Sequence, residues 1–161
     1  MRSPAARHAL RFGTALAVAV AVYHVFDLHD HGYWVPLTIL FVMRPEREES
    51  YHRIVLRAVG TGVGLVIATA LAELIGSDLV DGILLAVAIW LSYSMLTVQY
   101  ALFTTAVTIF VVLSVDTLGE PALEAAGQRA LGTAIGLAII FLAFVIWPNP
   151  EPDATVGEAP A

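Results

Sequence analysis

The stretch Arg57-Ala58-Val59-Gly60-Thr61-Gly62-Val63-Gly64-Leu65 returns, with small changes, as Arg129-Ala130-Leu131-Gly132-Thr133-Ala134-Ile135-Gly136-Leu137. The second copy begins 72 residues after the first. Each copy opens an apolar run of about 20 residues, the length that an α-helix needs to cross a bilayer. A motif repeated at the start of two such runs indicates an internal duplication, and duplicated halves are frequent in membrane transporters.

The composition of the chain is typical of a membrane protein. Of its 161 residues, 58% are hydrophobic, and the mean hydropathy is +0.80, whereas soluble domains contain about 45–50% apolar residues. The net charge is −6 and all eight basic residues are arginines, so we expect no nucleic-acid partner. The chain has no cysteine, which excludes disulfides, iron–sulfur clusters and thiol catalysis.

The sequence shows no motif of a known catalytic class. It contains no nucleophile elbow, zinc-protease helix, phosphate-binding loop or dinucleotide fingerprint. We therefore expect neither an enzyme nor a cofactor or metal.

The apolar pattern predicts an all-α membrane protein with six transmembrane helices. The apolar stretches are residues 9–26, 33–43, 54–75, 79–96, 101–115 and 126–147. We expect residues 1–148 to form one six-helix integral membrane module and residues 149–161 a disordered acidic C-terminal tail. A cleavable signal peptide is a second interpretation of the start, but its Ala-x-Ala site at 19–21 lies inside the apolar run.

The arginines predict the orientation of the helices. Seven of the eight fall before or within the first turn of the first stretch, or between the second stretch and the first turn of the third: Arg2, Arg7, Arg11, Arg44, Arg47, Arg53 and Arg57. The positive-inside rule then places both termini in the cytoplasm and leaves Arg129 as the only arginine on the outer side.

This orientation makes the repeat an inverted one. Two full segments separate the two motifs, so the third and sixth helices start at opposite faces of the membrane. The second and fifth segments echo the pairing, because Tyr33 precedes Thr38 by five residues as Tyr100 precedes Thr105. We predict two inverted three-helix halves.

We further predict that the second and fifth helices are short or interrupted. Eleven helical residues rise only about 16 Å, against a hydrocarbon core of about 30 Å. The second segment contains Pro36, which we expect to break or kink the helix, and the fifth contains Thr104, Thr105 and Thr108. Such segments mark transport sites. The alternative is that both are ordinary spans whose ends extend into polar neighbours.

Two groups of residues resemble a known membrane family. The first is Gly32-Tyr33-Trp34-Val35-Pro36-Leu37-Thr38-Ile39-Leu40-Phe41-Val42-Met43-Arg44-Pro45, followed by Arg57-x-x-Gly60-Thr61-x-x-Gly64. The second is Arg129-Ala130-Leu131-Gly132-Thr133-Ala134-Ile135-Gly136 with the exit Trp147-Pro148. In order and spacing, residues 8–148 resemble the fusaric-acid-resistance-like membrane family. That family includes bacterial aromatic acid exporters and is related to plant aluminium-activated malate transporters.

The resemblance implies a multi-pass protein of the bacterial plasma (inner) membrane that exports small organic anions, such as aromatic or other carboxylic acids. Many relatives join two modules with a large soluble domain, whereas this chain holds one module. We therefore expect a homo-oligomer, a dimer or larger, or pairing with another membrane module in the bilayer. A passive anion channel and a non-transporting membrane subunit of a larger assembly are the alternatives.

The repeated motif has both packing and charged positions. Its arginine, first glycine, threonine and second glycine lie at i, i+3, i+4 and i+7, which is one face of a helix. GxxxG pairs let another helix approach closely. We assign these residues to helix packing: Gly60, Thr61, Gly64, Gly132, Thr133 and Gly136.

The two arginines are the principal candidates for substrate binding. A helix N-terminus carries a partial positive charge, so an arginine there creates a doubly positive spot that suits a carboxylate. The alternative for Arg57 is that it snorkels to lipid phosphates, and for Arg129 that it pairs with Glu120 or Glu124. We add Trp34, Thr38 and Thr105 to the substrate-binding candidates; an interfacial belt position is the other interpretation for Trp34, as for Tyr33.

One cluster of titratable residues lies at the end of the first segment. His24 and Asp27 share a helix face, and His29, Asp30 and His31 follow. Proton coupling through His24 and Asp27 is a hypothesis for an exporter, because a histidine and a carboxylate can exchange protons near neutral pH. A metal site and a solvated loop are the alternatives.

Overall fold

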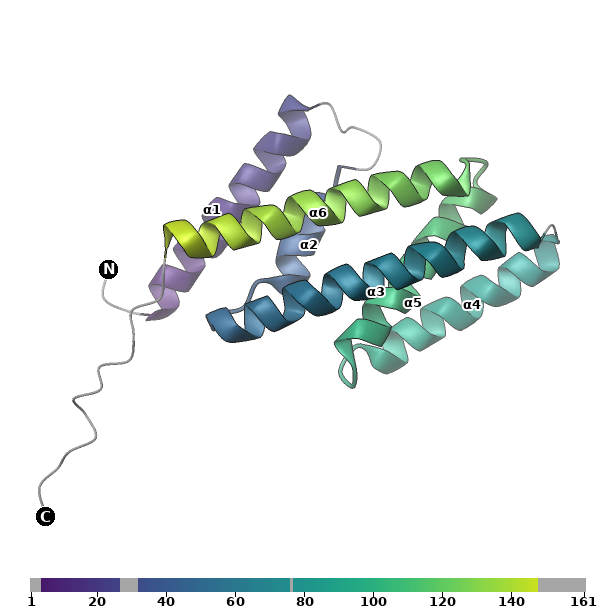
Figure 1. Cartoon of the computed structure of the whole chain (residues 1–161), viewed down its shortest axis with the longest axis horizontal. Coiled ribbons are helices and arrows are strands. Elements are labelled where there is room, and N and C mark those ends of the chain that lie inside the picture. The colour runs from purple at the N-terminus through teal and green to yellow at the C-terminus, as the bar shows by residue number, and fades with distance from the viewer. Residues whose placement is uncertain (1–3, 27–31, 76, 148–161) are drawn as a thin grey trace, which may run out of the picture.

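The computed structural model describes residues 4–26, 32–75 and 77–147, and these residues form an all-helical structure (Figure 1). No strand occurs in these ranges. The helices are α1 (Pro4–Val25), α2 (Trp34–Val42), α3 (Arg47–Leu74), α4 (Asp78–Met95), α5 (Tyr100–Thr117) and α6 (Ala122–Ile146). The predicted all-α class is confirmed, whereas the predicted tail lies outside the described residues.

Four of these helices are long and apolar enough to cross a membrane. They are α1, α3, α5 and α6, with α1 counted as Ala5–Val25. The helix α2 has nine residues, and the apolar part of α4, Leu79–Met95, is shorter than the four spans. The short second helix is thus confirmed, and six spans stay a prediction.

The prediction that the fifth helix is short or interrupted is wrong. The helix α5 has 18 residues and is one of the four spans. Its threonines do not interrupt it, because each hydroxyl donates to a carbonyl of the preceding turn. Thr105 and Thr108 donate to the carbonyl oxygens of Ala101 and Thr104 at 3.0 and 2.8 Å.

Pro36 does not break α2 either. It is the third residue of the helix. Backbone N–H groups in the first turn have no partner within a helix, so a proline there removes no hydrogen bond. The helix therefore continues through Pro36 to Val42, and the backbone N–H of Leu37 bonds the carbonyl oxygen of Tyr33 at 3.2 Å.

The two helices that carry the repeated motif form the centre of the fold. α3 and α6 contact each other and run in opposite directions (Figure 1). α5 packs on α3 and is covered by α4, while α2 packs on α6 and is covered by α1. The second helix of each sequence half thus packs mainly against the third helix of the other half.

Glycines of α3 allow the close approach of α5. A Cβ atom at Gly64 would lie 2.7 Å from Cβ of Thr108 and 2.8 Å from the carbonyl oxygen of Thr105. A Cβ at Gly60 would overlap the side chain of Thr104. Only glycine fits at these two positions without displacing α5.

The glycines of α6 make the equivalent contact with α2. A Cβ at Gly132 would lie 2.8 Å from Cβ of Trp34. A Cβ at Gly136 would lie 2.7 Å from Cβ of Thr38 and 3.0 Å from the carbonyl oxygen of Val35. The same motif therefore holds a different helix on each side of the centre.

These contacts correct the predicted correspondence between the second and fifth segments. Thr38 lies on Gly136, and the residue on the equivalent Gly64 is Thr108, not Thr105. The residue of α5 that corresponds to Thr38 thus lies three residues, close to one helical turn, after the one that the sequence pattern predicts. Tyr33 and Tyr100 both lie at helix starts, so their spacing from the threonines does not determine which residues meet the glycines.

Candidate anion-binding site

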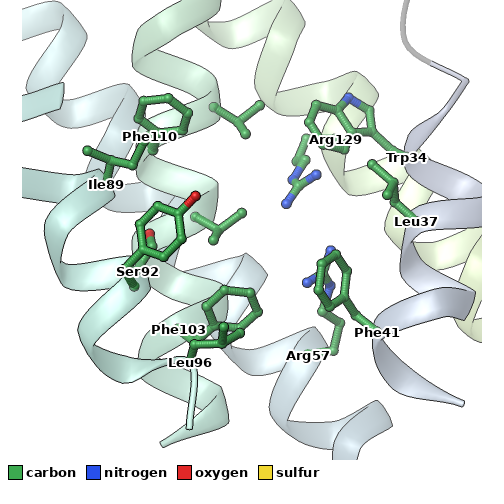
Figure 2. A pocket seen from close by; sticks show the side chains of 13 residues that line it. Trp34, Leu37, Phe41, Arg57, Ile89, Ser92, Leu96, Phe103, Phe110 and Arg129 are labelled. Atoms are coloured by element: carbon green, nitrogen blue, oxygen red, sulfur yellow. The ribbon is translucent and has the colours of Figure 1, made fainter. Parts of the chain in front are cut away.

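A pocket of about 320 Å³ lies between α2 on one side and α4 and α5 on the other (Figure 2). α2 contacts neither α4 nor α5 through the backbone, because each is held by a different central helix. Arginines of α3 and α6 close the space between them. The lining residues are Trp34, Leu37, Phe41, Arg57, Ile89, Ser92, Tyr93, Leu96, Phe103, Val107, Phe110, Val111 and Arg129.

The two repeated arginines meet in this pocket, but the prediction that they lie at helix N-termini is wrong, because Arg57 is the eleventh residue of α3 and Arg129 the eighth of α6. The side chain of Arg57 comes from α3 and that of Arg129 from α6, and both guanidinium groups point into the same space, toward each other (Figure 2). Arg57 is only 2% exposed and Arg129 only 1%. Two positive charges are thus held together inside an apolar bundle, which disfavours both of them unless an anion is present.

Neither arginine has an acidic partner in the described part of the chain. Among the residues that the structure describes, no carboxylate lies within ion-pair distance of Arg57 or Arg129. The Nε atoms of both and the Nη1 atom of Arg129 are buried without a hydrogen bond. These donors are available for an oxygen ligand.

A third buried arginine shows the contrast. Arg11 of α1 is 4% exposed, but its guanidinium donates to the carbonyl oxygens of Pro45 at 3.1 Å and Trp147 at 3.4 Å. It also lies 3.9 Å from the centre of the Phe144 ring. Arg11 therefore fixes the ends of neighbouring helices, whereas Arg57 and Arg129 point donors into a pocket.

Aromatic rings of α2 position both guanidinium groups. The Arg129 guanidinium lies 3.9 Å from the Trp34 ring centre, and that of Arg57 lies 5.9 Å from the Phe41 ring centre. Trp34 and Phe41 are seven residues apart and share one face of α2 with Leu37. Each contact is a cation–π interaction, which holds a positive charge without neutralising it.

The rest of the wall was not predicted. Phe103 of α5 lies 5.8 Å, between ring centres, from Phe41 and closes one end of the pocket. Phe110 and the α4 residues complete it. In a chain this apolar, no sequence signal separates an aromatic that faces a pocket from one that faces lipid; the i, i+3, i+7 spacing in α2 was the one available clue.

Of the predicted substrate-binding residues, Arg57, Arg129 and Trp34 line the pocket, and Thr38 and Thr105 do not. Thr38 lies against Gly136 and donates its hydroxyl to the carbonyl oxygen of Trp34 at 2.8 Å. The hydroxyl of Thr105 is likewise used within its own helix. The structure brings the threonines into the helix contacts that shape the pocket.

The alternatives considered for the aromatic and charged residues do not fit this geometry. Arg57 is too deeply buried to reach lipid phosphates. Glu120 and Glu124 are exposed and form no ion pair with Arg129. Trp34 is 8% exposed, so it is no belt residue facing lipid headgroups.

The titratable cluster at the end of α1 is described only in part. His24 is exposed, and its ring centre lies 4.8 Å from that of Tyr23. Asp27, His29, Asp30 and His31 lie outside the described residues. Proton coupling through His24 and Asp27 stays a prediction.

The fold and the pocket define an all-helical membrane protein in which two buried arginines share one pocket. Residues 15–143 match the model of the fusaric acid resistance protein-like family. The chain therefore belongs to this family, and the resemblance noted in the sequence is confirmed.

Curated relatives support the membrane assignment. The inner membrane protein YccS of Escherichia coli K12 is 37% identical over 144 residues, which are 89% of this chain and 20% of that protein. A protein of Haemophilus influenzae is 30% identical over 148 residues, 91% of this chain and 20% of its own length. The E. coli protein YhfK is 31% identical over 150 residues, which are 92% of this chain and 21% of that protein.

The chain spans about a fifth of the length of these relatives. No solved structure matches the chain.

Proposed function

We propose that this chain is the membrane module of a transporter for small organic anions, and that Arg57 and Arg129 bind the anion. The observation that carries the proposal is the pair of buried guanidinium groups that share one pocket and have no carboxylate partner among the described residues. Removing a charge from water costs several kcal/mol per ion. An anion between the two groups would offset that cost and accept their free donors.

The pocket walls favour an aromatic or other carboxylic acid over an inorganic anion. Its volume of about 320 Å³ is at the lower end of the range for small-molecule sites. Its rings come from three helices and include Trp34, Phe41 and Phe103. An apolar or aromatic body would bury against these rings while its carboxylate meets the arginines. A benzoate-like molecule has this shape.

The exchanged helix packing supports an inverted repeat as the basis of transport. α5 lies on the glycines of α3, and α2 lies on those of α6. Each half therefore supplies one arginine, and its third helix packs against the pocket-lining second helix of the other half. Rocking of one half against the other would move the arginine pair between the two membrane faces. We place this module in the bacterial inner membrane with both ends cytoplasmic, assembled with a second module or copy.

Anion binding is the direct test. In the Trp90→Phe/Trp147→Phe background, Trp34 is the only tryptophan of the chain and reports on the pocket. We expect benzoate to change its emission saturably in lipid nanodiscs. Arg57→Gln and Arg129→Gln should each weaken binding at least tenfold, because a charge-assisted hydrogen bond contributes about 1.5–3 kcal/mol.

Arg47→Gln is the matched control, because Arg47 is exposed and lies away from the pocket. Equal benzoate affinity in all four proteins would contradict the proposal. Benzoate flux in proteoliposomes, with and without a proton gradient, then distinguishes coupled export from passive conductance.

A further inference from the structure

A second pocket, of about 360 Å³, lies where the start of α3 meets the turn between α4 and α5. We call it the outer pocket because it lies nearer the start of α3, on the predicted cytoplasmic side, and we call the pocket of Arg57 and Arg129 the central pocket. It is lined by Glu49, His52, Arg53, Leu56, Val98, Gln99, Tyr100 and Ala101. Arg53 is one helical turn before Arg57, so the two pockets each hold an arginine of the same helix.

Tyr100 contacts one residue of each pocket. Its ring centre lies 4.9 Å from the guanidinium of Arg53 and 5.9 Å from the ring centre of Phe103. Arg53 belongs to the outer pocket and Phe103 to the central one. Tyr100 is therefore well placed to meet an anion that moves from Arg53 to Arg57.

The Tyr100 hydroxyl is buried beside the Arg57 guanidinium. It has no hydrogen bond of good geometry to a described group. A guanidinium has donors only, so its contact with Arg57 gives the hydroxyl proton no acceptor, and a carboxylate would supply one.

Tyr51, at the start of the same helix α3, shows the ordinary arrangement. Its hydroxyl accepts from Nε and Nη2 of Arg47 at 3.2 and 3.0 Å, and the Arg47 guanidinium lies 5.2 Å from its ring centre. The two Arg–Tyr pairs resemble each other in ring geometry, but only the Tyr51 hydroxyl makes a hydrogen bond of good geometry.

We propose that Tyr100 is the passage residue through which a carboxylate moves between Arg53 in the outer pocket and Arg57 in the central pocket. The proposal rests on the anion-binding function proposed above. Arg53 attracts the carboxylate, although it holds Glu49 at 3.1 Å when no anion is present. The Tyr100 hydroxyl then donates to the carboxylate as it leaves Arg53, before both central arginines receive it.

The test measures rates as well as affinity. Benzoate association is followed by stopped flow through Trp34 emission in nanodiscs, in the background without Trp90 and Trp147. Tyr100→Phe keeps the ring and removes only the hydroxyl. We expect its association and dissociation rates to fall together by about tenfold, the effect of one hydrogen bond to a charged group, with Kd nearly unchanged. Arg53→Gln should slow association as well.

Tyr51→Phe and Arg47→Gln are the matched controls and should leave the rates unchanged. Wild-type rates in Tyr100→Phe, or an equal slowing in Tyr51→Phe, would overturn the passage role while anion binding stands. A weaker Kd with unchanged association would overturn it too, because the hydroxyl would then belong to the bound state. If the wild type binds no benzoate, the proposed function fails and this inference fails with it.

Discussion

At the scale of single residues, Arg129 opposes the stability of the fold that holds it. It is 1% exposed, lies beside another arginine in the pocket and has no acidic partner among the described residues. Its contact with the Trp34 ring contributes about 2 kcal/mol or somewhat more in a desolvated site, which offsets only part of the several kcal/mol that burial of a charge costs. A residue with this balance is expected where function, not folding, requires it.

Arg129→Gln should therefore make the protein more stable while weakening anion binding. The neutral amide is cheaper to bury and no longer repels Arg57. We expect the free energy of unfolding to rise by at least about 1 kcal/mol, or Tm by about 2–4 °C for a chain of this size. Thermal unfolding in detergent, at low ionic strength and without organic anions, measures this change.

Arg11→Gln is the informative comparison. Arg11 is also buried, but it bonds two carbonyl oxygens at helix ends, so its loss should lower Tm. A lower Tm in Arg129→Gln would mean that Arg129 is structural, against the binding role.

The sequence predicted the charged part of the site but not its walls. Arg57 and Arg129 were found because each opens a copy of the same motif. Phe41, Phe103 and Tyr100 gave no comparable signal, because aromatic residues in a membrane helix contact lipid and protein alike. Which aromatic residues face the pocket depends on how α2 and α5 rotate on the glycines, a tertiary property that single segments do not contain.

At the scale of helices, the apolar stretches predicted where helices form, whereas the proline and threonines within them did not predict where helices end. All six apolar stretches became helices. Pro36 and the threonines of α5 predict interruptions that the structure does not contain. Both are compatible with a continuous helix, since Pro36 lies in a first turn and the threonine hydroxyls bond their own helix.

The glycine contacts between helices are testable position by position. In Gly136→Ala, the new Cβ would lie 2.7 Å from Cβ of Thr38. Because backbone and a short side chain face it, α2 must move away, and we expect a loss of about 1–3 kcal/mol of stability. Benzoate affinity should fall as well, since α2 carries Trp34 and Phe41. Thermal unfolding and the Trp34 titration provide the two measurements.

Gly62→Ala is the control on the same motif. A Cβ at Gly62 would meet no atom within 4 Å, and alanine is favoured over glycine in a helix by about 0.5–1 kcal/mol. This variant should be as stable as the wild type or more so. If Gly136→Ala behaves like Gly62→Ala, the close approach of α2 and α6 is not real.

At the scale of the whole molecule, the exchange of packing partners produces the pocket. Had α2 packed on α3 and α5 on α6 within each half, the two arginines would face separate helix pairs. Because α2 lies on α6 and α5 lies on α3, a gap stays open between α2 and α5, and one arginine from each half closes it. A duplicated motif can thus build one two-charge site instead of two single-charge sites.

The inverted arrangement makes a prediction about membrane sides. α3 and α6 run in opposite directions (Figure 1), so the start of α3 and the turn before α6 should lie on opposite faces. The chain has no cysteine, so Glu48→Cys and Leu118→Cys each introduce a single thiol at an exposed position. A membrane-impermeant maleimide should label Leu118→Cys in intact spheroplasts, and Glu48→Cys only after permeabilisation. Labelling of both from the same side would mean that the arginines do not approach the pocket from opposite faces, and would remove the basis for alternating access.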